Sequence, residues 1–195
     1  VSLLRFRLHM LLRHPDAALA SIAHSPDWLL ARFEHSATPI GLLRGQALAM
    51  KGDAAAARDA FVQARQALQS RLENPVTAAD AQSFLGLVDA GLGEKQSALA
   101  AGRAAVEQLP MSRDAMVGSY TLERLARAES QIGETTSAID HLRRLMESPS
   151  GEVVSVATLR IDPVWDPLRN DPRFEKLIED GEAAEKAQAS HAGIE

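Results

Sequence analysis

The chain of 195 residues contains no cysteine, and only 4% of its residues are aromatic. Without cysteine it can form no disulfide, no thiolate zinc site and no nucleophilic thiol. The scarcity of aromatic residues and the abundance of alanine favour closely packed helices over a β-sandwich, because strands prefer β-branched and aromatic side chains. The formal charge of −5 argues against a general nucleic-acid binder, which needs clustered lysine and arginine.

The chain also lacks a long uninterrupted apolar run and the usual catalytic motifs. Residues 1–14 are apolar but contain Arg5, Arg7 and Arg13, and they are too short to span a bilayer. We expect there a first helix that packs on the next one. No phosphate-binding loop and no G-x-S-x-G motif occurs, and the six histidines give no i, i+4 pair for a helical zinc site. We therefore expect that this 195-residue segment binds no metal or cofactor and has no catalytic activity.

What the chain does contain is a turn that occurs three times. Gly52, Gly93 and Gly133 are separated by 41 and 40 residues, and each is followed directly by an acidic residue. Glycine closes the last turn of a helix in the left-handed conformation, and an acidic residue favours the start of the next helix. Small residues stand at matching positions before and after each turn: Gly45, Gly86 and Ala126 before it, and Ala57, Ala98 and Ala138 after it. The pattern predicts three pairs of closely packed antiparallel helices.

These spacings resemble the tetratricopeptide repeat (TPR). The first unit matches through Gly45, Gly52-Asp53, Ala57, Phe61 and Ala64. The second and third match through Leu85, Gly86, Gly93, Ala98, Ala105 and Pro110, and through Leu125, Ala126, Gly133, Ala138 and Leu142. The resemblance implies an all-α fold, an α-solenoid of antiparallel helix pairs. Its period of about 40 residues is longer than that of a standard TPR unit.

We divide the chain into four parts. Residues 1–38 form a degenerate N-terminal repeat and a connecting helix, for which Ser25 is the expected N-cap and Trp28, Leu29 and Phe33 follow at helical spacing. Residues 39–150 hold the three helix pairs; Thr38-Pro39 begins the first of them, and Thr77 and Ser112 are the expected caps of the other two. Residues 151–180 are a C-terminal cap, and 181–195 a frayed helix end or disordered tail.

The cap contains the stretch "IDPVWDPLRNDPRF", in which Asp162, Asp166 and Asp171 each precede a proline. Asp-Pro suits the start of a helix, so we expect a tight turn through Trp165 and a last helix from Pro172 to about Asp180. The expected cap residues are Asp162, Trp165, Asp166, Leu168, Asp171 and Phe174, which would cover the apolar end of the array. The alternative is a reactive site that combines these acids with Arg160, Arg169 and Arg173.

Residues 148–177 carry a second resemblance, to the ends of TPR regions in bacterial multidomain signalling proteins. Those proteins join the array to a kinase, a nucleotide cyclase or a winged-helix domain. The resemblance implies that the chain is the sensory or regulatory C-terminal part of such a protein. We expect a cytoplasmic location, or a periplasmic one if a membrane anchor precedes Val1.

The TPR resemblance also implies a binding surface, because the first helix of each pair lines a concave groove that holds a protein or peptide. The positions with side chains suited to contacts are Gln46, Asp80, Ser83, Tyr120, Glu123 and Arg127. We expect a protein partner and no contact with nucleic acid or membrane. Two alternatives remain: a homo-oligomerisation module, and an enzyme that uses the acids and arginines of residues 160–173.

Overall fold

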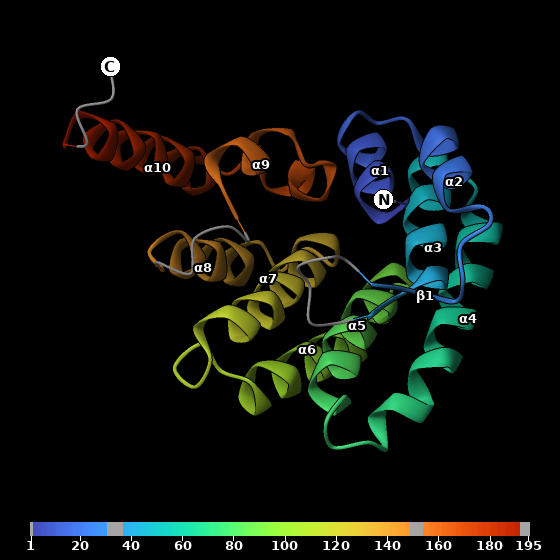
Figure 1. Cartoon of the computed structure of the whole chain (residues 1–195). Helices are drawn as coiled ribbons and strands as arrows, with labels where there is room; N and C mark the ends of the chain where they lie inside the picture. The colour runs from blue at the N-terminus through green and yellow to red at the C-terminus, as the bar shows by residue number, and fades with distance from the viewer. Residues whose placement is uncertain (1, 31–36, 149–153, 192–195) are drawn as a thin grey trace.

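The computed structural model describes residues 2–30, 37–148 and 154–191, which form mainly α-helices (Figure 1). The all-α class predicted from the sequence is confirmed, apart from two short strands. The elements follow one another as α1 (Ser2–Leu11), α2 (Pro15–Ile22), β1 (Trp28–Leu30), β2 (Ala37–Pro39), α3 (Ile40–Lys51), α4 (Ala54–Leu72), α5 (Ala78–Gly91), α6 (Lys95–Gln108), α7 (Ala115–Gln131), α8 (Thr135–Met146), α9 (Val156–Ile161), the 3-10 helix η1 (Pro163–Leu168) and α10 (Pro172–His191).

The three repeated turns join α3 to α4, α5 to α6 and α7 to α8. Gly52, Gly93 and Gly133 have φ of 87°, 77° and 81°, the left-handed conformation predicted for them. The acidic residues that follow are not equivalent. Asp53 caps α4 by accepting a hydrogen bond from the backbone N–H of Ala56, whereas the side chains of Glu94 and Glu134 make no capping bond. They form ion pairs instead, with Arg65 and Lys95 respectively.

The small residues on either side of the turns let paired helices approach closely. A Cβ atom added at Gly45 of α3 would lie 2.5 Å from the ring of Phe61 on α4, so only glycine fits without a shift. Phe61 is itself buried, with 3% of its surface exposed. Ala57, Ala98 and Ala138 are also buried, as the repeat pattern predicts.

The prediction of a helix that begins after Ser25 is wrong. Residues Trp28–Leu30 form β1, which pairs antiparallel with β2 in the register Trp28↔Pro39 and Leu30↔Ala37. A short apolar run does not distinguish strand from helix by its periodicity, and here a partner later in the chain satisfies its backbone groups. Trp28 also lies beneath the guanidinium of Arg71, 4.5 Å from the ring centroid. Phe33 falls outside the described residues.

Several predicted helix boundaries also shift. Because Thr38 and Pro39 belong to β2, α3 begins at Ile40. The Thr77 hydroxyl makes no cap bond and donates to the Arg71 carbonyl, while α7 is capped by Asp114 rather than Ser112. The last helix continues past Asp180 to His191, because residues 182–188 are mostly strong helix formers.

Within the described residues, the core consists of three apolar clusters that follow the order of the chain. The first joins α1, α2, β1 and α3; the second joins α3, α4, α5 and α6 with Ala128 of α7; the third joins α7 and α8 to α9, η1 and α10. Helices α3, α5 and α7 contact one another in succession. Figure 1 shows that this path curves, so that α1 and α9 face each other at the top of the view.

Candidate functional site

A cavity of about 800 Å³ lies between the N-terminal helices and the C-terminal segment. Its walls come from α1, from α3, α5 and α7, and from residues 158–167. The wall is mixed in character. Its partly exposed apolar residues are Met10, Leu11, Met50, Pro163 and Val164, and its polar groups come from Gln46, Tyr120, Glu123, Arg124 and Arg127. A volume of this size falls within the range of ligand-binding pockets.

The structure places four of the six predicted groove residues at this cavity. Gln46 of α3 and Tyr120, Glu123 and Arg127 of α7 line it. Asp80 and Ser83 of α5 do not line it. Both accept hydrogen bonds from the guanidinium of Arg124, which does line it.

Arg124 is a buried cation in the cavity wall that the sequence did not single out. Its side chain is 8% exposed, and Nη1 donates to Asp80 Oδ1 at 2.8 Å and to Ser83 Oγ at 2.9 Å. The guanidinium also lies 3.9 Å from the centroid of the Phe84 ring. Asp80 and Ser83 therefore position Arg124, and the Asp80 carboxylate neutralises its charge.

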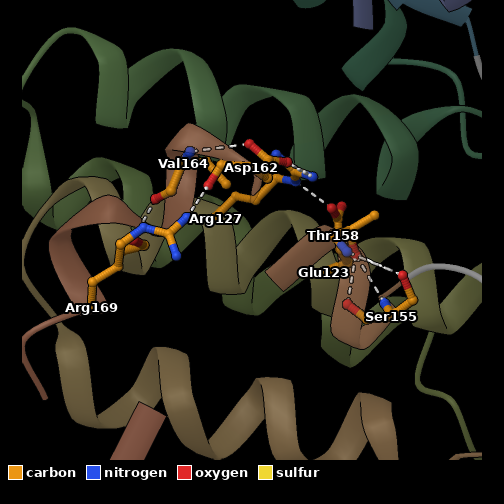
Figure 2. Close-up of polar contacts among 8 residues, drawn as sticks. Glu123, Arg127, Ser155, Thr158, Asp162, Val164 and Arg169 are labelled. Atoms are coloured by element: carbon orange, nitrogen blue, oxygen red, sulfur yellow. Dashed lines mark hydrogen bonds and ion pairs between the residues drawn. The ribbon is translucent and has the colours of Figure 1, made fainter. Parts of the chain in front are cut away.

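Arg127 links α7 to the C-terminal segment (Figure 2). Its Nη2 donates to Asp162 Oδ2 at 2.8 Å, and its Nε donates to Glu123 one helical turn earlier. The guanidinium lies 5.3 Å from the centroid of the Trp165 ring. Burial lowers the pKa of Arg127, but the two carboxylates outweigh it and raise that pKa above the ordinary value. Arg127 is thus permanently charged and paired with two carboxylates of the chain.

The C-terminal segment is held by caps as well as by this ion pair. Asp162 Oδ1 accepts from the Val164 N–H at 3.0 Å, and Arg169 donates to the Asp162 carbonyl at 3.3 Å (Figure 2). Asp171 precedes α10 and accepts from the Arg173 N–H and guanidinium, which lower the pKa of its carboxyl to about 2. The apolar cap residues Trp165, Leu168 and Phe174 are buried in the third cluster.

Asp166 does not begin a helix, contrary to the prediction from the Asp-Pro pattern. It lies within η1. Its carboxylate oxygens accept hydrogen bonds from the guanidinium of Arg13 at 2.7 and 2.9 Å and from Nε of Arg169 at 2.8 Å. The hydrogen bond from Arg13 is the main reason why the pKa of Asp166 is lowered. Arg13 stands in the turn between α1 and α2 with φ of 58°.

We call the pair Arg13 and Asp166 the clasp, because it joins residues 153 positions apart at the rim of the cavity. Its side chains are 53% and 40% exposed. Exposed ion pairs contribute at most about 1 kcal/mol and weaken in salt. The clasp therefore closes the rim without fixing it rigidly.

The sequence does not reveal that α1 and residues 162–167 share one cavity. The apolar residues of α1 predict that this helix packs on the next one, but not that Met10 lines the same cavity as residues of α7. The sequence places Arg13 near one end and Asp162 and Asp166 near the other, but nothing in it indicates that these side chains meet.

The other polar clusters give less support for a functional site than the cavity does. Within residues 2–30, 37–148 and 154–191, no group of three or more histidine, aspartate or glutamate side chains could hold a metal ion. The buried carboxylate of Glu129 contacts His141 Nδ1 at 2.8 Å, while its Oε1 lacks a partner. In the same part of the chain, no helix is long and apolar enough to cross a membrane.

Comparison with protein-family models, with curated proteins and with solved structures finds no match to this chain.

Proposed function

We propose that the chain is a non-catalytic, TPR-like α-solenoid that binds a protein or peptide in the cavity between α1, α7 and the C-terminal segment. One observation carries the proposal: Gln46, Tyr120, Glu123 and Arg127, chosen as groove positions from the repeat alone, line the same cavity. Regular helix-pair units whose first helices contact in succession support the solenoid assignment.

The acids and arginines of residues 160–173 favour this proposal over the enzyme alternative. Asp162 and Asp171 cap helices and bind Arg127 and Arg173, and Asp166 binds Arg13 and Arg169. A catalytic acid or base needs access to its substrate and a pKa near the working pH, whereas Asp166 and Asp171 have lowered pKa values. Their contacts fit a structural role.

The resemblance of residues 148–177 to the ends of TPR regions in bacterial signalling proteins extends the proposal. In that setting the cavity would receive the partner, and the partner would regulate a module elsewhere in the same protein. We propose no contact with nucleic acid, because the chain is acidic overall.

The test is selection from a library of random peptides on the intact chain, followed by titration of the enriched peptides. We expect Gln46→Ala and Tyr120→Ala to weaken binding, because both side chains face the cavity. Gln66→Ala is the matched control, since Gln66 is exposed on α4 outside the cavity. Equal affinity for all these variants would count against the proposal.

Self-association is the second candidate, and it rests on the outer face of α1. Leu4 and Leu8 of α1 and Leu12, directly after it, recur every fourth residue and are 75%, 52% and 53% exposed. Such a stripe is typical of a helix that packs on another helix. A solution mass that rises with concentration, and that Leu8→Glu returns to the monomer value, would support it; the monomer mass at every concentration would exclude it.

A further inference from the structure

The geometry points to a specific class of ligand for this cavity: a short, uncharged and predominantly apolar peptide segment of a partner protein. The inference rests on the proposed function, since it assigns the chemistry of the peptide that the cavity takes. Three properties of the wall carry it: its charges are neutralised from within, its free polar groups are neutral, and the rest of its surface is apolar.

The charges of the cavity wall are already paired. Arg13 binds Asp166, Arg124 binds Asp80, and Arg127 binds both Glu123 and Asp162. Arg7, the other arginine of the wall, is not free either. A ligand carboxylate would have to displace one of these internal carboxylates, and a ligand cation would meet carboxylates that arginines already occupy. The wall therefore offers no unsatisfied charge to a charged ligand.

Neutral polar side chains of the wall remain available, among them Gln46, Tyr120 and Gln131. In the part of the chain that the structure describes, Gln46 and Tyr120 make no side-chain hydrogen bond. Gln46 stands on α3 and Tyr120 on α7, so they lie on different walls of the cavity. A glutamine amide both donates and accepts, and a tyrosine hydroxyl can do either. Neutral groups of this kind match the N–H and C=O groups of a peptide backbone.

The apolar part of the wall selects the side chains of the peptide. Met10 and Leu11 of α1, Met50 of α3, and Pro163 and Val164 of η1 are partly exposed and supply apolar surface to the lining. Apolar side chains gain free energy when they leave water for such a surface. A charged side chain placed there would lose its hydration without gaining a partner, because the nearby charges are paired.

The experiment uses the intact chain and a displayed library of random peptides, and it scores the composition of the enriched sequences. We expect uncharged sequences rich in leucine, methionine and phenylalanine to be enriched. For a synthetic peptide from that set, replacing one apolar residue with aspartate or lysine should weaken binding by about 10-fold or more. Raising salt from about 50 to 500 mM should change Kd by less than about 2-fold, because no ion pair forms with the ligand.

The outcomes separate this inference from the proposed function. Enrichment of acidic or basic peptides, with binding that weakens in salt and is lost in Tyr120→Ala, overturns the inference and leaves the proposed function standing. Failure to enrich any peptide that depends on Gln46 or Tyr120 overturns both. Concentration-dependent dimerisation that Tyr120→Ala abolishes identifies a second copy of the chain as the occupant and also overturns the inference.

Discussion

Replacing Arg127 with leucine is expected to destabilise the fold more than any other single loss of charge in the cavity wall. The arginine side chain is 27% exposed, and its partners Glu123 and Asp162 are 11% and 14% exposed. The substitution leaves two mostly buried carboxylates without their cation. Removing one partner of a fully buried pair costs about 3–5 kcal/mol, and partial solvent access reduces the expected cost to about 2–3 kcal/mol.

Thermal unfolding followed by far-ultraviolet circular dichroism measures this cost. In a chain of this size each kcal/mol lowers Tm by about 2–4 °C, so Arg127→Leu should lower Tm by roughly 5–10 °C. Adding Glu123→Gln and Asp162→Asn should recover part of the loss, because the orphaned charges disappear while asparagine can still cap η1.

The matched control is Arg143→Leu, which breaks an exposed pair between Arg143 and Asp140 on α8. That pair should contribute less than about 1 kcal/mol. The reasoning about Arg127 is refuted if the two leucine variants unfold at the same temperature. The result also matters for binding studies, since weaker binding by Arg127→Ala identifies a groove contact only when the variant is still folded.

Three further changes test the helix packing, the C-terminal cluster and the clasp. Gly45→Ala should cost about 1–3 kcal/mol because its Cβ would lie 2.5 Å from the Phe61 ring, whereas Gly52→Ala should cost only about 1–2 kcal/mol, from its φ of 87°; chemical denaturation compares them, and the reverse order would contradict the packing argument. Trp165→Ala should cost about 3–5 kcal/mol, because a large side chain that is 1% exposed leaves a cavity; a loss below about 1 kcal/mol would mean that it does not anchor the third cluster. Asp166→Asn should lengthen the distance between spin labels on α2 and α10 with little change in Tm, and high salt should do the same to the wild type. Because the folded pKa of Asp166 is lowered, its contribution is complete above the unfolded pKa of about 3.9 and disappears as pH falls through the lower folded value, so the wild type should open in acid. Unchanged label distances would show that the clasp does not hold the rim.

The repeat was predictable because its signals are local. A glycine with positive φ, an acid after it and small residues at fixed offsets specify a turn and a close helix pair within about 20 residues. Asp162 and Asp171 behave as the Asp-Pro pattern predicts for the same reason, since capping involves only the next two residues. The prediction of a helix at Trp28 was wrong because its strand partner, Pro39, lies too far along the chain for a local pattern to indicate it.

By itself the sequence determined the helical class, the three turns and the small residues that bring Gly45 close to Phe61. Only the tertiary structure decided the role of Asp166, the closure of the rim through Arg13, and the pairing of each charge in the cavity wall. The physical reason is one of range. Turns and caps depend on residues a few positions apart, whereas the clasp joins side chains 153 positions apart. Their meeting depends on the curvature that all the intervening helix contacts produce together.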